Sequence, residues 1–369
     1  MVHQGSVHKA GHGKPARTAP PRHAAGSSPR GTPGARSPKS GAAGLDVVGI
    51  GNAILDVIAH ADDDFLLTSG LPKGAMTLID AARAAELYDS MGPAVEVSGG
   101  SAANTLVALA SFGGSGGFIG KVRNDQLGGI FRHDIHAAGV LFTTPPAETG
   151  PPTARCLIFV TPDAQRTMQT YLGACTGLTP EDIDEELITG AKVTYLEGYL
   201  WDPPQAKEAF LKAAQLAHKA GRKVALSLSD PFCVERHRAE FHELVEHHVD
   251  ILFANEFEIM SLYEVSHFDD VVQHVRGMCE IAALTRSAKG SVILSGQEVH
   301  VIDATPIPQV VDTTGAGDAY AGGFLYGLTR GFDLAGCGRL GSIAAAEVIG
   351  HFGARPETPL VDLVAAAEL

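Results

Sequence analysis

The chain has 369 residues, 45% of them hydrophobic, so it is long enough to bury one large core or two modest ones. It carries 28 Lys/Arg against 42 Asp/Glu, and this net charge of −14 argues against binding to nucleic-acid backbones. No apolar run approaches the roughly 18 residues of a membrane-spanning helix, so no membrane partner is expected.

Residues 1–44 differ in composition from the rest, with seven Lys/Arg, four His and no acidic residue. Residues 45–369 hold the other 21 Lys/Arg and all 42 Asp/Glu, a net charge of −21. The basic tail has no periodicity and too few large apolar residues to offset the entropy of ordering, which predicts disorder. A transit peptide, a nucleic-acid-seeking arm, a misassigned start and a functionless extension remain open for it. The folded domain is predicted to span 45–369.

The first predicted strand, Leu45–Ala59, is rich in Val and Ile and is interrupted by two glycines. A dinucleotide-binding fingerprint is the rival interpretation, but Ile54 occupies its third glycine position and strand-like residues follow. Asn52, Ile54 and Asp56 are spaced by two, so an extended backbone points all three to one side. If Asn52 and Asp56 are buried, their side chains need hydrogen-bond partners such as a sugar diol. An edge strand facing water explains the spacing equally well.

A di-glycine precedes the next predicted helix, which is rich in Ala, Leu and Val and ends near Phe112. Gly99 and Gly100 leave two backbone amides accessible at the helix entrance. Asn104 falls in the first turn, where an amide side chain is either solvated or holds a ligand.

A β-hairpin is predicted from Arg155–Val160 and Arg166–Tyr171, joined by a turn. Arg166 at its second strand is either a solvated turn residue or a permanently charged, forked anion ligand. Further along, Tyr195–Trp201 holds the only Trp beside two Tyr, including Tyr199. Such an aromatic cluster is by default part of a core.

From Val193 onward apolar strands alternate with helices, which implies a largely parallel sheet with helices on both faces. Ligands bind at the carboxyl ends of such strands, and Asn255 and Glu258 follow one of them. Asn with Glu three residues later is also a helix-capping box. The predicted elements are strands at 193–198, 223–229, 249–253, 291–295, 299–302 and 308–311, and helices at 204–220, 236–247, 256–264, 268–283 and 319–328.

A tight turn of small residues, Gly315, Ala316 and Gly317, separates the last predicted strand from the last helix. A helix start exposes backbone N–H groups at the positive end of the dipole, and small residues let an anion approach them. Asp318 beside such a site would repel the anion, but it suits a base that takes a proton from a hydroxyl. A glycine turn with a capping Asp is the simpler alternative.

Several of these motifs resemble those of one family. Asp312–Asp318, followed by Ala-Gly-Gly-Phe, resembles the C-terminal signature of the ribokinase-like (PfkB) kinases, and Ser98–Asn104 resembles their N-terminal one. Gly51–Asp56, with Asp62–Leu66 after it, is similar to the opening of the adenosine kinase branch, and Gly70–Asp80 resembles its next lid segment. The resemblance covers nearly all of residues 45–369. It implies an α/β fold, a three-layer α/β/α sandwich with a small β-sheet lid built from segments near 57–80 and 153–172.

For the substrate, the resemblance implies that Asp56 binds ribose hydroxyls and that Asn104 and the di-glycine hold the sugar. Met76 takes the position that faces the base, where eukaryotic adenosine kinases carry Gln. Tyr199 falls in a Gly-aromatic segment near the base. The implied substrate-binding residues are Asn52, Ile54, Asp56, Met76, Gly99, Gly100, Ser101, Asn104 and Tyr199.

For catalysis, the resemblance implies that Asp318 is the base and that the amides of Gly315, Ala316 and Gly317 form the anion hole. Glu258 would orient Mg²⁺-bound water, and Asp312 would belong to a K⁺ site. The loop Thr285–Gly290 departs from the family's Thr-x-Gly-x-x-Gly because Ser287 replaces the first Gly. The implied nucleotide-binding residues are Arg166, Asn255, Glu258, Thr285, Ser287 and Gly290.

The resulting prediction is an ATP- and Mg²⁺-dependent kinase that phosphorylates the 5′-hydroxyl of a purine nucleoside, most readily adenosine. A kinase for ribose or fructose and a non-catalytic nucleoside- or sugar-binding regulator on the same fold are the alternatives. Five scattered cysteines without a CxxC pair favour a reducing cytoplasm over a disulfide framework or zinc site. A monomer or homodimer is expected, with a nucleoside or sugar and ATP as its partners.

Overall fold

The computed structural model describes residues 44–163 and 165–366, and the predicted basic tail at 1–44 lies almost wholly outside these residues. The larger of two sheets has nine strands in the order β14-β13-β12-β11-β10-β9-β1-β5-β6. Neighbouring strands run parallel from β6 to β12, and β13 and β14 are antiparallel. The strands are β1 (Val47–Ile50), β5 (Gly116–Ile119), β6 (Leu141–Phe142), β9 (Val193–Glu197), β10 (Lys223–Ser227), β11 (Ile251–Asn255), β12 (Ile281–Thr285), β13 (Ser291–Ser295) and β14 (Glu298–Ile302).

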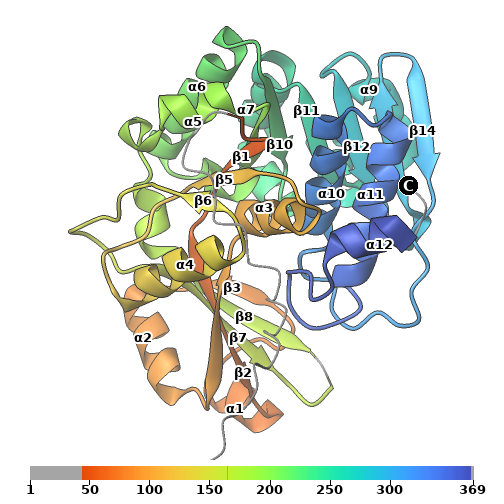
Figure 1. Cartoon of the computed structure of the whole chain (residues 1–369). Helices are drawn as coiled ribbons and strands as arrows, with labels where there is room; N and C mark the ends of the chain where they lie inside the picture. Colours follow the sequence, from red (N-terminus) through yellow and green to blue (C-terminus); the bar gives the residue numbers. More distant parts are fainter. Residues whose placement is uncertain (1–43, 164, 367–369) are drawn as a thin grey trace, which may run out of the picture. The chain divides into compact units, whose positions relative to one another are not determined.

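Helices cover both faces of this sheet (Figure 1). Successive strand residues alternate between the two cores: Val224 and Leu226 belong to one hydrophobic cluster, and Ala225 between them belongs to the other. The three-layer α/β/α prediction is therefore confirmed. One face carries α5 (Glu185–Gly190), α6 (Pro204–Lys219), α7 (Pro231–His248), α8 (Glu256–Tyr263) and α9 (Phe268–Val275), and the other carries α3 (Ser101–Ser111), α4 (Gln126–Ala137), α10 (Ala316–Arg330) and α11 (Leu334–Val348).

The second sheet has five strands in the order β3-β8-β7-β2-β4. Leu55 and Val57 on one face pack with the two helices that Figure 1 shows beside this sheet, α1 (Asp63–Thr68) and α2 (Ala81–Ser90). The segments predicted as a lid contribute four of these strands, and β4 lies outside both segments. The strands are β2 (Ile54–His60), β3 (Met76–Leu78), β4 (Ala94–Gly99), β7 (Ala154–Val160) and β8 (Arg166–Tyr171).

The single strand predicted over Leu45–Ala59 is wrong: the structure divides it into β1 and β2, which belong to different sheets. The chain passes between the sheets at Gly51–Ala53. A Cβ atom at Gly51 would collide with the side chain of Glu197, so this crossing is crowded. Sequence periodicity detects the extended backbone on both sides but not the change of sheet.

Other predicted bounds also differ from the structure. The helix predicted at 268–283 ends at Val275, after which Gly277 adopts a φ of 81° and β12 begins. Ala282 and Ala283 favour helices, but burial between β11 and β13 overrides that preference. No strand forms at 308–311, where the exposed Val310 has no sheet partner in the described part of the chain. The helix predicted at 236–247 begins earlier, at Pro231, and the helix predicted at 319–328 begins at Ala316.

Candidate active site

A cavity of about 890 Å³ is lined by residues of both sheets and by the start of α10. The last residues of four parallel strands reach it: Glu197, Ser227, Asn255 and Thr285. The cavity therefore lies where parallel strands end, the usual place for ligands in such folds. Of the residues predicted from the sequence, it is lined by Asn52, Ile54, Asp56, Met76, Gly100, Ser101, Asn104, Tyr199, Asn255, Glu258, Thr285, Gly315, Ala316, Gly317 and Asp318, whereas Gly99, Arg166, Ser287, Gly290 and Asp312 do not line it.

Asp318 lies in the first turn of α10 and faces the start of α3. Its Oδ1 accepts a hydrogen bond from Ser101 Oγ at 2.6 Å, and its Oδ2 accepts one from Asn104 Nδ2 at 3.3 Å. Burial raises the pKa of Asp318 to about 6, although these two hydrogen bonds oppose the rise. The carboxylate is thus held in place with a pKa close to neutrality, as a proton acceptor requires.

The turn before Asp318 requires glycine at its first position and is open to the cavity at its third. Gly315 caps α10 with a φ of 76°, and a Cβ atom there would lie 2.6 Å from the Cβ of Ala354. Apart from its own helix and chain neighbours, no described residue has a heavy atom within 4 Å of where a Cβ at Gly317 would be, so the space over the turn stays open. The first N–H groups of a helix lack intrahelical acceptors, so this turn offers an anion-binding site beside the carboxylate.

Asp56 approaches the same cavity from β2 of the second sheet. Burial raises its pKa to about 6, and the charge of Asp318 adds to the rise, whereas Arg355 and Arg166 oppose it. A Cβ atom at Gly99 would lie 2.5 Å from Asp56 Oδ2, so glycine at this position leaves room for the carboxyl group. Two carboxyl groups, one from β2 and one from α10, therefore line the same cavity, and the charge of Asp318 contributes to the raised pKa of Asp56.

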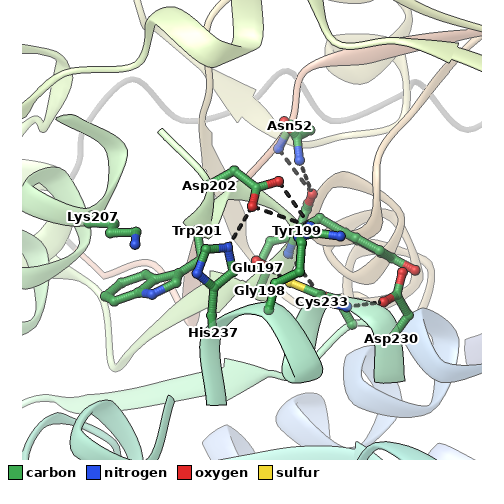
Figure 2. A network of polar contacts seen from close by, with 12 residues as sticks. Asn52, Glu197, Gly198, Tyr199, Trp201, Asp202, Lys207, Asp230, Cys233 and His237 are labelled. Carbon is green, nitrogen blue, oxygen red and sulfur yellow. Dashed lines mark hydrogen bonds and ion pairs between the residues drawn. The ribbon is translucent and has the colours of Figure 1, made fainter. Parts of the chain in front are cut away.

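Glu197 connects the segment Gly51–Ala53, where the chain passes between the sheets, to α3. The sequence analysis did not identify this residue. Its Oε1 accepts from Asn52 Nδ2 at 2.6 Å, and its Oε2 accepts from the backbone N–H of Ala102 at 2.8 Å (Figure 2 shows the bond to Asn52). Burial raises the pKa of Glu197 to about 7. A carboxylate as the last residue of an otherwise apolar parallel strand is the signal that could have identified it.

Arg355 orients Asn104, and the sequence analysis missed this role as well. Arg355 Nε donates to Asn104 Oδ1 at 3.1 Å, and its Nη1 pairs with Asp134 Oδ2 at 3.1 Å. With its oxygen occupied in this way, Asn104 presents its amide nitrogen to Asp318. An Asn in the first turn of an apolar helix is thus buried with partners on both sides rather than solvated.

Arg166 connects the second sheet to the segment before α10. It pairs with Asp312 and donates to Thr314 Oγ1 at 3.0 Å, while its Nε has no hydrogen-bond partner among the described residues. Burial acts to raise the pKa of Asp312, but hydrogen bonds from Gly353 and Thr314 and the charge of Arg166 hold it below its usual range. Arg166 is therefore an ion-paired residue beside the turn Gly315–Gly317 rather than a solvated turn residue.

Asn255 and Glu258 form the helix-capping box and also line the cavity. Asn255 Oδ1 accepts from the N–H of Glu258 at 2.9 Å, and Glu258 Oε2 accepts from the N–H of Asn255 at 2.9 Å. Burial raises the pKa of Glu258 to about 7, and the nearby Asp230 and Asp318 add to it. This concentration of carboxylates at one end of the cavity fits a hydrated divalent cation. Among the described residues, no three metal-ligating side chains gather to coordinate one directly.

The remaining predicted residues divide between cavity and surroundings. Met76 and Tyr199 line the cavity and are 46% and 38% exposed. Trp201 is buried with Phe210 and Phe241, as expected of a core aromatic. In the loop after β12, Thr285 reaches the cavity, whereas Ser287 and Gly290 do not.

Known proteins resemble this chain in sequence and in fold. Residues 75–360 match the family model described as pfkB family carbohydrate kinase. The crystal structure of adenosine kinase from Sinorhizobium meliloti is 53% identical with a TM-score of 0.82, and the match covers 88% of this chain and 100% of that one. A probable sugar kinase protein from Rhizobium etli CFN 42 is 51% identical with a TM-score of 0.82, covering 88% and 98%.

Adenosine kinase from Anopheles gambiae, in complex with P1,P4-di(adenosine-5) tetraphosphate, is 26% identical with a TM-score of 0.73, covering 83% of this chain and 96% of that one. Within the residues described here, no helix has the length and apolar character to cross a membrane. The family match and these similarities confirm the resemblance predicted from the sequence. The chain belongs to the pfkB family of carbohydrate kinases, with the ribokinase-like fold, and is a phosphotransferase that acts on a hydroxyl group with ATP and Mg²⁺ as the family's general requirements.

Proposed function

We propose that this enzyme transfers the γ-phosphoryl group of ATP to the 5′-hydroxyl of a purine nucleoside, with adenosine as the preferred acceptor. One observation carries the choice of a nucleoside: the second sheet, which supplies Asp56, also contributes an apolar wall to the cavity. A free sugar would place hydroxyl groups against this wall, whereas a flat base would bury apolar surface there. The wall comprises Ile54, Met76, Leu78, Met168 and Leu172.

In the proposed reaction, Asp318 accepts the proton of the 5′-hydroxyl as that oxygen bonds to the γ-phosphorus. The bond from the γ-phosphorus to the bridging oxygen breaks, and ADP leaves. The N–H groups of the turn Gly315–Gly317 hold the charge that develops on the transferred group. Ser101 and Asn104 keep the carboxylate oriented throughout, since both donate to it. Asp56, Asn52 and Gly100 hold the ribose.

At the other end of the cavity, Asn255 and Glu258 are proposed to lie beside the phosphates. Glu258 would hold Mg²⁺ through water, and that cation would neutralise charge on the phosphates. Arg166 supports the same end, because it donates to Thr314, one residue before the anion-binding turn. Thr285, Ser287 and Gly290 are proposed to border the nucleotide, although only Thr285 lines the cavity.

The names of the relatives support a nucleoside substrate, and one of them supports a sugar substrate instead. The Sinorhizobium meliloti protein is named an adenosine kinase, and the Anopheles gambiae enzyme was solved with two adenosines joined by four phosphates, which fits an acceptor and a nucleotide in one site. The Rhizobium etli protein, of nearly equal similarity, is named a probable sugar kinase protein. A kinase for ribose or fructose is therefore the second candidate.

The deciding experiment measures MgATP-dependent phosphorylation of adenosine, inosine, guanosine, ribose and fructose by the full chain. Turnover of a nucleoside without turnover of the sugars supports the proposal and identifies the base. Turnover of ribose or fructose alone would overturn the nucleoside assignment and keep the chemistry. The same assay with K⁺ replaced by choline tests the predicted K⁺ site at Asp312. A cytoplasmic location and a monomeric or homodimeric state remain predictions.

A further inference from the structure

The lining of the cavity has more acidic than basic side chains, although the proposed nucleotide is a negatively charged triphosphate. Six carboxyl groups line it: Asp56, Glu197, Asp202, Asp230, Glu258 and Asp318. Arg236 is the only Lys or Arg among the described residues that line it. Arg166 is engaged with Asp312 and is not part of the lining. A polyphosphate entering this cavity would therefore meet one protein cation.

Arg236 is held at the cavity wall by an acidic partner. Its Nη2 lies 3.2 and 3.0 Å from the two carboxylate oxygens of Asp202, and its guanidinium group lies 4.5 Å from the ring centroid of Phe232. The side chain of Arg236 is 33% exposed and that of Asp202 is 37% exposed, so both reach open space. An ion pair this exposed contributes little to stability and can be exchanged.

Asp202 would keep a second partner if Arg236 moved away from it. Asp202 Oδ1 also lies 2.5 Å from His237 Nε2, and Figure 2 shows the Asp202 carboxylate pointing toward the His237 ring. His237 is itself fixed on its other side by Glu240, at 3.0 Å from Nδ1. Asp202 therefore keeps a hydrogen-bond partner when Arg236 turns away.

The backbone also separates Arg236 from the rest of its helix. His237 has non-helical angles, φ −123° and ψ 21°, so α7 is kinked immediately after Arg236. Cys233 and Val234 of the segment before the kink are buried in the core, so a change of partner by Arg236 requires only a different side-chain rotamer. Phe232 and Arg236, on this segment, both line the cavity.

We propose that Arg236 is a phosphate-binding residue that exchanges Asp202 for the polyphosphate of ATP when the nucleotide enters the cavity. The inference rests on the proposed function, since it concerns the same cavity and the same nucleotide. A guanidinium group can bind phosphate oxygens through two parallel hydrogen bonds, whereas Asp202 engages only Nη2 of Arg236. Asp202 acts as the resting partner and competes with the nucleotide.

The test measures binding of MgATP and of adenosine to the full chain by calorimetry, with turnover recorded separately. Arg236→Met is expected to weaken MgATP binding by about 10- to 100-fold, as expected for loss of a hydrogen bond to a charged group, and to leave adenosine binding within about twofold. Arg236→Lys is expected to recover part of the loss. The matched control is Arg238→Met on the same helix: Arg238 is 31% exposed, pairs with Glu264 and does not line the cavity.

The variant Asp202→Asn tests whether Arg236 binds phosphate or serves only in a structural ion pair with Asp202. Removal of the competing carboxylate should leave MgATP binding unchanged or tighten it by a few fold, opposite in sign to Arg236→Met. Equal weakening by both variants, or wild-type MgATP binding in Arg236→Met, would overturn this inference while the proposed function stands. Absence of MgATP binding and turnover in the wild-type chain would instead overturn the proposed function together with this inference.

Discussion

Ser101 Oγ donates a hydrogen bond of 2.6 Å to Asp318 Oδ1 and so joins the first residue of α3 to the first turn of α10. The second oxygen of Asp318 has a longer contact, 3.3 Å from Asn104 Nδ2. Oδ1 is thus the anchored oxygen, and Oδ2 is the better placed to accept a proton. Because both donors belong to the helix that follows the di-glycine, the two signature motifs meet at one carboxylate.

The first prediction concerns this carboxylate. Asp318→Asn keeps the size of the side chain but removes the proton acceptor, so kcat should fall by about 100- to 10,000-fold, the usual contribution of a general base. Because Asn can still accept a hydrogen bond from Ser101, thermal unfolding should change by only a few degrees. Steady-state kinetics and calorimetric unfolding of the same preparation check both expectations. Near-normal turnover by a folded variant would remove Asp318 from the role of base.

The second prediction is a pH profile. Since burial raises the pKa of Asp318 to about 6, the rate should fall as the pH drops below about 6, where the carboxylate becomes protonated. Asp56 titrates in the same range, so the observed acid limb belongs to the pair. Ser101→Ala removes a hydrogen bond that lowers the pKa of Asp318, so the acid limb should move to higher pH. Ser90→Ala, on the exposed face of α2, is the control. An unchanged limb in Ser101→Ala would assign the titration to another group.

The sequence predicted those parts of the site that are encoded locally. Gly315, Ala316, Gly317 and Asp318 are consecutive, so the turn, the helix start and the carboxylate can be inferred from one short stretch. The alternation of apolar strands and helices likewise predicted the parallel sheet, because its period is a property of neighbouring residues.

What the sequence did not predict depends on contacts between distant segments. Glu197 and Asn52 are 145 residues apart, and each is an ordinary polar residue until the fold brings them together. Arg355 became interpretable only through Asn104, 251 residues away. The strand β12 was missed because Ala282 and Ala283 favour helices locally, whereas their burial within the sheet is a tertiary effect.

The third prediction concerns Glu197 and stability. Its pKa is about 7 in the folded chain, above the ordinary value of 4.5, so the folded state prefers the protonated form. Protonated Glu197 stabilises the folded state by about 3 kcal/mol. This stabilisation is fully present below pH 4.5 and is lost as the pH rises through about 7. In Glu197→Gln the free energy of unfolding should therefore decline less between pH 5 and pH 8 than in the wild type.

Urea unfolding of both proteins at the two pH values measures this difference, and other titrating groups cancel in the comparison. Glu298→Gln is the control, because the Glu298 side chain is 72% exposed and lies outside the cavity. If the decline were equally steep in Glu197→Gln and the wild type, Glu197 would have an ordinary pKa in the folded chain.

The fourth prediction uses Met76 to distinguish binding of a nucleoside from binding of a free sugar. This side chain lies on the apolar wall and is 46% exposed, so a bound base would cover surface that is now open. Met76→Ala should weaken adenosine binding by about 5- to 10-fold, as expected for losing roughly 1 kcal/mol of apolar burial. Ribose would leave Met76 uncovered, so its binding should not change. Leu67→Ala, 79% exposed on α1 and outside the cavity, is the matched control. Equal weakening of adenosine and ribose would show that the base does not lie against this wall.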